Sequence, residues 1–411
     1  MRMKLHCALF LLLLSVLCGC SDLERENPYD GQLHTLNVTT VYPDDYEALC
    51  REGVAVSVED VERGNSYRAL TDASGTASFT LSNGIYRVMV NDRVDLDIFN
   101  GTADKVKLVG GDVALSLPLI YSKAGSIIIK EIYCGGCTKY PQEGQYQSDK
   151  YIILHNNDSE TQYLDGLCFG TFDPYNSQGT NVWVIQDEVT GATVFPDFVP
   201  VVQAIWQFGG TGTTFPLGPG EDAVLVVCGA IDHATPYPLS VNLNKEGYFV
   251  CYNPVYFWNT LYHPAPGDRI TPDRYLDVVI KTGQANAFTF SISSPAVVLF
   301  RPQDTTVQEF ILGDGNVIQK PGSTVDRIVK IPLTWVVDGV EVFYGGSSNN
   351  KKRIPPAIDA GYVTQSALYT GRSMHRRVDD EASSEAGYEI LVDTNNSSVD
   401  FYERAQQSLH D

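Results

Sequence analysis

Positively charged side chains are scarce in this chain. It has 29 lysines and arginines against 50 aspartates and glutamates, which gives a formal net charge of −21 at pH 7. Binding to nucleic-acid phosphates or to anionic lipid requires a basic face, so this balance argues against both as partners. We therefore predict no nucleic-acid partner. The excess of acid identifies no other partner by itself.

Long apolar runs are absent beyond the N-terminus. The run Leu5–Val16 is too short to span a bilayer comfortably, and no later run approaches eighteen apolar residues. The sequence therefore predicts no membrane-spanning helix, and any attachment to a membrane has to come from another device.

Sequence signatures of catalysis and metal binding are also missing. Neither G-x-S-x-G nor H-E-x-x-H occurs, and the seven histidines are scattered. A zinc site built on C-x-x-C needs two further ligands at matching spacing, but there is no second C-x-x-C and no H-x-x-x-H. No calcium loop of the D-x-D-x-D-G type is present. We predict a protein that is not an enzyme and holds no metal and no cofactor, with an unrecognised hydrolase as one alternative.

What the chain does contain favours β-structure. Tyrosine (23), phenylalanine (17) and glycine (35) are plentiful, while only 19% of the residues are charged. This composition is typical of turn-rich sheets rather than helix bundles, and 411 residues suffice for two or three domains. The expected fold class is all-β.

The N-terminus carries a candidate export signal. A short basic segment, Met1–Lys4, precedes the apolar run and leads to Leu17-Cys18-Gly19-Cys20. This tetrapeptide resembles the bacterial lipobox, which implies a signal peptide over residues 1–19 and a membrane anchor through lipid on Cys20. An ordinary secretory signal that happens to contain cysteines is the alternative.

The residues that follow Cys20 are predicted to form an acidic tether over residues 20–32. Ser21–Glu26 reads SDLERE and resembles the export tags that send lipoproteins of gut Bacteroidetes to the outer face of the outer membrane. The resemblance implies a lipid-anchored outer-membrane protein on the extracellular face. A polar tether with no targeting role is the alternative.

A small β-module is predicted over residues 33–121. Apolar residues alternate in several short runs, and Thr71–Gly75 reads as a tight turn in which Asp72 bonds its own downstream backbone. Asn83-Gly84 reads as a hairpin turn. The TD-x-x-G-x-a-x-F and G-x-Y-x-V signatures resemble the carboxypeptidase-regulatory-like, transthyretin-type β-sandwich, a module that usually serves as a spacer.

A larger β-domain with loop insertions is predicted over residues 125–411. Its motifs resemble those of lamin-tail-like domains, which are immunoglobulin-type β-sandwiches. The matching pieces, in chain order, are Ile127–Tyr133, Asp149–Asn157, Leu164–Leu167, Leu217–Asp222, Gly371–Arg377 and Asp393–Phe401. One departure is Ile153, which stands where that family commonly has glutamate.

The order of signal, small sandwich and large sandwich resembles an uncharacterised family of Bacteroidetes surface lipoproteins, a domain of unknown function. Members of that family tend to be associated with TonB-dependent receptors, so the resemblance implies such a receptor as a partner. It brings no activity with it.

Cys134-Gly135-Gly136-Cys137 is the sharpest motif in the chain. It follows a predicted strand, so a redox role lacks the helix N-terminus that lowers a thiol's pKa. A local disulfide or a pair of free thiols is the favoured interpretation, with a metal or redox site as alternatives. No connectivity is assigned to the other cysteines.

An aromatic insertion is the candidate ligand platform. It lies within Tyr237–Thr282, and the rings proposed to bind are Tyr252, Tyr256, Phe257, Trp258 and Tyr262. Exposed tyrosine and tryptophan rings bind sugar faces or anchor protein interfaces. The alternative is that these rings fill the core, and the same alternative applies to a second cluster of Trp183, Trp206 and Phe208.

These observations predict a surface-exposed outer-membrane lipoprotein that acts as a non-enzymatic binding component of a TonB-dependent uptake or surface complex. A stand-alone lipoprotein that binds a glycan or a peptide is the first alternative.

Overall fold

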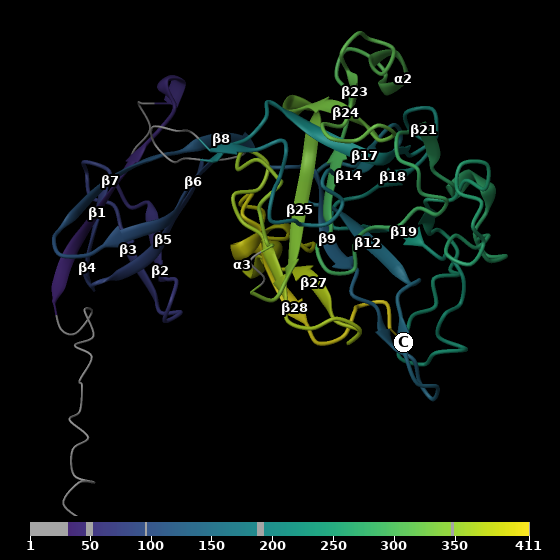
Figure 1. The fold of residues 1–411 in the computed structure, drawn as a ribbon, viewed down its shortest axis with the longest axis horizontal. Coiled ribbons are helices and arrows are strands. Elements are labelled where there is room, and N and C mark those ends of the chain that lie inside the picture. Colours follow the sequence, from purple (N-terminus) through teal and green to yellow (C-terminus); the bar gives the residue numbers. More distant parts are fainter. Residues whose placement is uncertain (1–31, 47–51, 95–96, 187–192, 347–348, 411) are drawn as a thin grey trace, which may run out of the picture. The chain divides into compact units, whose positions relative to one another are not determined.

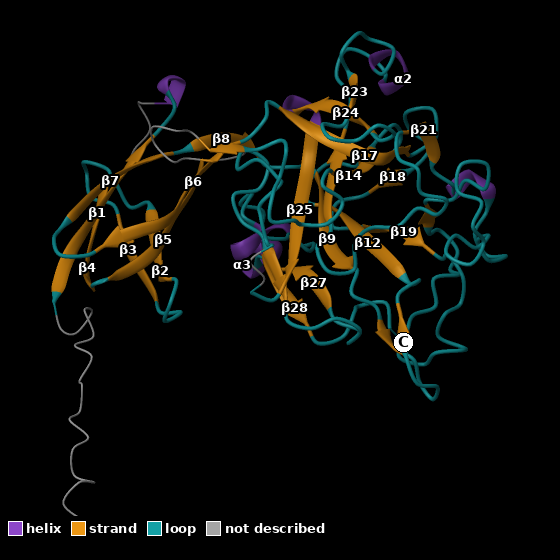
Figure 2. Cartoon of the chain, viewed as in Figure 1, coloured by secondary structure: helices purple, strands orange, loops and turns teal. Residues whose placement is uncertain are grey.

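The computed structural model describes residues 32–46, 52–94, 97–186, 193–346 and 349–410. Strands far outnumber helices in the described chain, which confirms the all-β prediction (Figure 1, Figure 2). Among these residues no helix is long and apolar enough to cross a membrane. The signal and Cys20 lie outside the described residues. The described helices are α2 (Val307–Phe310), α3 (Asp380–Ala386) and α4 (Ser397–Asp400), with 3-10 turns η1 (Asp44–Tyr46), η2 (Pro272–Arg274) and η3 (Leu333–Trp335).

The chain divides into two compact units. The first comprises the described parts of Met1–Thr39, Cys50–Val88 and Ala103–Leu117. The second comprises those of Thr40–Leu49, Met89–Thr102 and Pro118–Asp411. The predicted domain boundary between residues 121 and 125 stays a prediction.

Four of the N-terminal strands described here, β1, β2, β4 and β5, alternate buried residues with more exposed ones. Their bounds are β1 (Leu33–Val41), β2 (Ala55–Asp60), β3 (Ser66–Leu70), β4 (Thr76–Ser82), β5 (Gly84–Val94), β6 (Asp97–Leu108), β7 (Val113–Pro118) and β8 (Ile120–Lys123). One sheet has the order β4-β1-β7 and the other β3-β2-β5-β6-β8. In β1, Leu36 and Val38 are fully buried, as a period of two requires.

The two predicted turns in this region have different outcomes. The turn at Asp72 is confirmed, because its Oδ1 accepts hydrogen bonds from the N–H groups of Ser74 (2.8 Å) and Thr76 (3.1 Å), and Gly75 has φ 77°. The hairpin at Asn83-Gly84 is wrong, because β4 and β5 belong to different sheets. Asn83 is buried and accepts a hydrogen bond from the N–H of Gly110, so it connects two sheets instead of closing a hairpin.

The second unit contains two larger sheets. A six-stranded sheet has the order β20-β19-β12-β9-β27-β28, and an eight-stranded sheet has the order β23-β24-β17-β14-β22-β25-β26, with β21 paired to β17. The strands of the first are β9 (Ile127–Tyr133), β12 (Lys150–Asn156), β19 (Asp222–Cys228), β20 (Phe249–Val250), β27 (Ser373–Arg376) and β28 (Phe401–Arg404). Those of the second are β14 (Cys168–Phe172), β17 (Phe198–Gln207), β21 (Asp277–Lys281), β22 (Ala296–Phe300), β23 (Val317–Gln319), β24 (Arg327–Pro332), β25 (Val336–Tyr344) and β26 (Val363–Gln365).

The described residues of this unit also form three two-stranded ladders. They are β10 (Cys137–Thr138) with β11 (Gln145–Tyr146), β13 (Gln162–Tyr163) with β18 (Pro216–Leu217), and β15 (Ile185–Gln186) with β16 (Thr193–Val194). The β10–β11 ladder holds the second cysteine of the C-G-G-C motif.

Strand β12 lies at the centre of the six-stranded sheet and is buried on both faces. It pairs antiparallel with β9 and with β19, so that Ile152 lies opposite Ile132 and Leu225. Ile152 and Leu154 face the core between the two sheets, whereas Tyr151 and Ile153 face a second core on the other side. Burial on both faces explains why Tyr151–Leu154 is a continuous apolar run within this strand.

The predicted insertion supplies the cover for that second core. Val241, Leu243 and Ile270 pack with Tyr151 and Val226 against the outer face of the six-stranded sheet. The insertion is therefore part of the folded body, and only its loops remain available for contacts with other molecules.

Candidate functional site

The aromatic loop that follows β20 is the candidate binding site, and its rings differ in their exposure to solvent. Tyr256, Trp258 and Tyr262 are exposed, by 43%, 66% and 49% of their surfaces. Phe257 is buried and Tyr252 is half-buried. The structure therefore keeps three of the five predicted platform residues at the surface.

Phe257 is a core residue, which corrects its assignment to the platform. Its ring stacks on Trp206 with centroids 5.5 Å apart and lies 5.7 Å from Phe288. The N–H of Phe257 donates to the carbonyl oxygen of Asn253 (2.9 Å), and this turn directs residue 257 inward while residue 258 faces solvent. Phe257 therefore attaches the loop to the core.

Tyr252 also supports the loop instead of forming its exposed face. Its ring stacks on His263 at 5.2 Å and packs edge-on against Tyr275. His263 is buried, and burial lowers its pKa to about 4. Its Nε2 accepts a hydrogen bond from the N–H of Asn253 (3.2 Å), which requires the neutral ring. The ring of His263 is thus a structural part of the loop.

Two asparagines fix the shape of the loop. The Oδ1 of Asn253 accepts hydrogen bonds from the N–H groups of Val255 (3.0 Å) and Tyr256 (3.1 Å). The Oδ1 of Asn259 accepts one from Leu261 (3.2 Å), and its Nδ2 donates to Asn286 (3.2 Å). Such side-chain-to-backbone bonds are typical of Asx turns, and here they hold two successive turns in place.

Two aliphatic residues of this loop are also exposed, and neither was predicted as a site residue from the sequence. Val255 is 81% exposed and Leu261 is 73% exposed. Together with the three exposed rings they form a surface that we call the 255–262 patch: Val255, Tyr256, Trp258, Leu261 and Tyr262. Both lie in a stretch of sequence without charged residues. A search of that stretch for apolar residues of any kind, and not for aromatic residues alone, would have found them. Of the second cluster, Trp206 and Phe208 are buried.

The C-G-G-C motif forms a tight structural turn. Gly136 has φ 70°, and a Cβ placed on it would lie 2.1 Å from the carbonyl oxygen of Tyr146, so only glycine fits there. The carbonyl oxygens of Gly135 and Gly136 accept hydrogen bonds from the N–H groups of Tyr369 and Gly371, both at 2.9 Å. The motif therefore joins the β10–β11 ladder to the segment before β27.

Cys134 and Cys137 are free and buried. Burial raises the pKa of both thiols to about 12. The thiol of Cys137 lies 3.8 Å from Asp149 Oδ2, which also accepts hydrogen bonds from Tyr133 and Ser240. Of the two parts of the favoured interpretation, this geometry corresponds to free thiols, and burial keeps both of them protonated and away from solvent.

Thiol labelling tests this assignment. Cys134 and Cys137 should stay unmodified by iodoacetamide at pH 8 in the native protein, because both thiols are buried and protonated at that pH. Both should be alkylated in concentrated guanidinium chloride, which serves as the control. Peptide mass spectrometry measures each site. Rapid alkylation of either cysteine in the native state would contradict the structural role.

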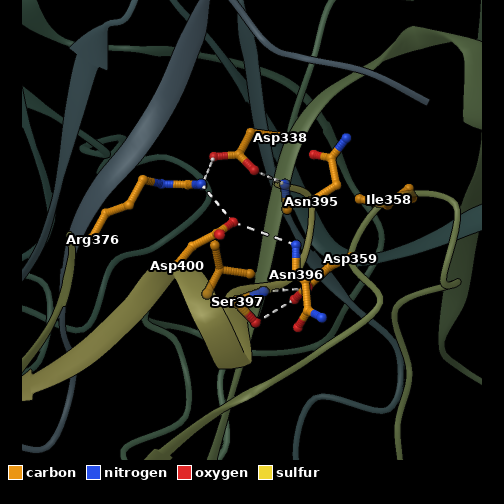
Figure 3. A pocket seen from close by; sticks show the side chains of 10 residues that line it. Asp338, Ile358, Asp359, Arg376, Asn395, Asn396, Ser397 and Asp400 are labelled. Atoms are coloured by element: carbon orange, nitrogen blue, oxygen red, sulfur yellow. Dashed lines mark hydrogen bonds and ion pairs between the residues drawn. The ribbon is translucent and has the colours of Figure 1, made fainter. Parts of the chain in front are cut away.

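A buried arginine organises the last strands of the second unit. Arg376 in β27 donates to Asp338 Oδ2 (2.9 Å) in β25, and its Nη1 lies 3.3 Å from Asp400 Oδ2 in α4 (Figure 3). It also donates to Asp393 Oδ1 (2.9 Å). All four side chains are buried. Burial opposes the charge of Arg376, but the three carboxylates outweigh it and raise the pKa of the guanidinium.

Two of these carboxyl groups, Asp338 and Asp400, have raised pKa values because they are buried. Burial raises the pKa of Asp338 to about 6 and that of Asp400 to about 7, although Arg376 pulls both down. Ser397 N–H and Oγ donate to Asp359, a further buried carboxylate in the same pocket (Figure 3). The guanidinium points at Asp338 and Asp400, so this pocket is an internal ion network and offers no substrate site.

A third polar cluster brings together residue types that bind metals. One ligand atom from each of His155, Asp222 and Glu389 lies within 4.8 Å of the others. Lys130 Nζ, however, donates to both Asp222 (2.6 Å) and Glu389. His155 Nδ1 lies 2.7 Å from Asp222 Oδ1. The ammonium of Lys130 already supplies the positive charge at this position, so the cluster is an ion-pair network that connects β9, β12 and β19.

Comparisons with known proteins support the fold and little more. A family described as "Protein of unknown function (DUF4876)" matches residues 218–408. The crystal structure of a DUF4876 family protein from Bacteroides thetaiotaomicron is 24% identical, and the match covers 90% of this chain and 94% of that one with a TM-score of 0.56. This likeness shows the fold.

More distant structures carry no argument. A DUF3823 family protein from Parabacteroides merdae is 16% identical over 44% of this chain and 83% of that one, with a TM-score of 0.18. No curated protein matches the chain. The expected domain of unknown function is confirmed at that level, while the two named modules and the lipid anchor stay predictions. Residues 218–408, which include the whole 255–262 patch, are thus the part of this chain that matches the DUF4876 family.

Proposed function

We propose that this protein is a lipoprotein anchored in the outer membrane through Cys20, exposed at the cell surface, and that it acts as a non-enzymatic binding component of a TonB-dependent uptake or surface complex. The observation that carries the proposal is the 255–262 patch: five large apolar side chains exposed on one short loop. Exposed apolar clusters rimmed by polar surface are typical of protein interaction sites.

The chemistry of the buried groups supports binding over catalysis. The thiols of Cys134 and Cys137 are buried with raised pKa values, and His263 is buried in the neutral form. His155 is enclosed in the ion-pair network around Lys130. A general base or nucleophile has to reach its substrate, and these groups contact only other parts of the chain.

The location of the protein rests on the sequence. The lipobox at Leu17–Cys20 and the acidic segment that follows support a lipid anchor and display on the outer face. Protease shaving of intact cells tests the display: the tagged domain should be removed while a periplasmic control protein stays intact. Survival of the tagged domain on intact cells, followed by digestion after lysis, would contradict it.

A pull-down tests the partner. Full-length tagged protein, extracted from outer membranes in mild detergent, should retain a TonB-dependent β-barrel identified by mass spectrometry. Trp258→Ala should lower this recovery at least about fivefold, because truncation of a central interface tryptophan commonly costs more than 1 kcal/mol. Leu312→Ala is the matched control, since Leu312 is 85% exposed but lies outside the patch. Equal recovery with both variants would exclude the patch as the contact.

Glycan or peptide binding by the protein alone is the second candidate function. The observation that favours it is the exposure of three aromatic rings, Tyr256, Trp258 and Tyr262, which are suited to stacking on the apolar faces of sugars. If this candidate is correct, the wild-type protein should bind in a glycan or peptide array without a membrane partner, and Trp258→Ala should lose that binding.

A further inference from the structure

The short helix α3 is attached to the body of the second unit through polar contacts. None of its residues Asp380–Ala386 is buried, so the helix adds nothing to the hydrophobic cores. The contacts lie just after it, at Glu389, whose side chain accepts a hydrogen bond from Lys130 and whose carbonyl oxygen lies 3.0 Å from His155 Nε2. We infer that His155 is a buried imidazolium that holds residues 379–389 on the six-stranded sheet, and that loss of its proton at rising pH weakens this attachment.

Both ring nitrogens of His155 face atoms that can only accept hydrogen bonds. Nε2 faces the carbonyl oxygen of Glu389, and Nδ1 lies 2.7 Å from Asp222 Oδ1. Burial alone would raise the pKa of Asp222, but hydrogen bonds from His155 and Lys130 outweigh it and lower that pKa. A carboxylate has no proton to donate, and a neutral imidazole has only one N–H. Both acceptors are therefore satisfied only when the ring carries two protons.

The charges in this cluster balance only when His155 is protonated. The charged groups that face it are Asp222 on β19, Glu389 after α3 and Lys130 on β9. His155 itself lies on β12, and its side chain is fully buried, so water cannot replace a lost hydrogen-bond partner. With a neutral ring, Lys130 would be the single cation facing two carboxylates. Protonation of His155 and attachment of Glu389 are therefore linked.

Residues 379–389 depend on these two cations because the segment has none of its own. Its sequence, DDEASSEAGYE, contains five acidic side chains and no Lys, Arg or His, in a chain with a net charge of −21. Repulsion by the rest of the chain therefore opposes the attachment. Histidine is the side chain that ordinarily changes its charge between pH 5 and about 8. Stability that depends on its bound proton is complete at the acid end of this range and is lost as the pH rises.

NMR of the full-length wild-type protein tests the protonation state. With ¹⁵N-labelled histidine at pH 7, both nitrogens of His155 should have the chemical shifts of protonated nitrogens. His263 is the internal reference, because burial lowers its pKa to about 4 and its ring should show one nitrogen without a proton. A neutral His155 ring at pH 7 would overturn the inference.

Hydrogen exchange measured by mass spectrometry tests the consequence. After correction for the intrinsic pH dependence of exchange, protection of residues 379–390 should fall about tenfold or more between pH 5.5 and pH 8.5, since one linked proton changes an equilibrium by up to about tenfold per pH unit. His155→Gln keeps one N–H donor but cannot titrate, so protection of this segment should be low at pH 5.5. His410→Gln makes the same change outside the cluster and should keep the wild-type profile.

The comparison between variants isolates His155 from other titrating groups. Asp338 and Asp400 titrate in the same pH range, but they are present in every variant, so the difference between profiles belongs to His155. Equal profiles for the wild type and His155→Gln would overturn the inference, as would protection that increases toward pH 8.5. If His155→Gln does not fold, the NMR result and the wild-type exchange profile decide.

Discussion

Arg376→Met should lower the free energy of unfolding by about 3–5 kcal/mol at pH 8, because it leaves buried carboxylates without their counter-charge. The guanidinium is the shared partner of Asp338, Asp393 and Asp400, and all of them are buried. Methionine has a similar length but no charge, so the desolvation of the carboxylates remains while the compensating attraction is lost. Chemical denaturation of the full chain measures the change.

The loss of unfolding free energy caused by Arg376→Met should depend on pH. Asp338 and Asp400 have folded-state pKa values of about 6 and about 7, above the ordinary 3.8. A carboxyl group with a raised pKa contributes stability that is complete below its unfolded pKa and is lost as the pH rises through its folded pKa. Without the attraction of Arg376 both pKa values should rise further. The deficit of the variant should therefore shrink between about pH 8 and about pH 5.

Arg372→Met is the matched control for this experiment. Arg372 pairs with Glu403 at 2.9 Å, but its side chain is 41% exposed. Water can therefore solvate Glu403 once the substitution has removed its partner. Its loss should cost no more than about 1 kcal/mol at any pH. Equal costs for the two substitutions, or a cost for Arg376→Met that does not change with pH, would contradict the role of the buried network.

Strands that are buried on both faces were predictable from the sequence. Ile127–Tyr133 was predicted as a strand and is β9, and Lys150–His155 was predicted and is the body of β12. Both are rich in apolar residues because each contributes side chains to cores on opposite faces of the sheet, although β9 also includes Lys130 and Glu131. In such a segment the apolar residues favour a strand, and the buried position in the sheet also requires apolar residues. The strand can therefore be predicted from the sequence alone.

The hairpin predicted at Asn83-Gly84 shows why turns are harder. The residue pair suits a tight turn, but β4 pairs with β1 and β5 lies in the other sheet. A local pair of residues determines whether the chain can bend, whereas the pairing of the flanking strands depends on contacts that are distant in the sequence. The correct connection therefore could not be derived from these two residues.

The candidate site was predictable by region but not by residue. Phe257 and Trp258 are neighbours of the same type, yet one is buried against Trp206 and the other is 66% exposed. The loop has no regular periodicity that would assign one of them to the inside. Similarly, the closing motif contains Arg372, Arg376 and Arg377, and only the folded structure shows which of the three is surrounded by carboxylates.

Asp165→Ala should be the second severe substitution, with an expected loss of about 3 kcal/mol or more in the free energy of unfolding at pH 7. Asp165 Oδ1 accepts hydrogen bonds from the N–H groups of Gly212 (2.9 Å) and Thr214 (2.8 Å), and Oδ2 accepts one from Phe215 (2.8 Å). Alanine leaves these donors without their acceptor. It also releases Phe215, which packs on Phe249 in the core between the sheets.

The pH dependence of this loss has the opposite sign to that at Arg376. Burial alone would raise the pKa of Asp165, but the backbone donors outweigh it and lower the pKa to about 2. A carboxylate with a depressed pKa contributes stability that is present above its unfolded pKa and is lost as the pH falls through its folded pKa. The deficit of Asp165→Ala should therefore be complete at pH 7 and should shrink between about pH 4 and about pH 2.

Asp232→Ala provides the matched control in the same unit. Asp232 also accepts two backbone hydrogen bonds, from Ala234 (3.0 Å) and Thr235 (3.1 Å), but both belong to its own local turn and water can reach it. Its loss should cost about 1 kcal/mol. Asp165 accepts three backbone hydrogen bonds, one of them buried, and Asp232 accepts two in an open turn, so the difference in cost measures the third bond and the burial together. A cost at Asp165 no larger than that at Asp232 would mean that water reaches the loop at residues 212–215.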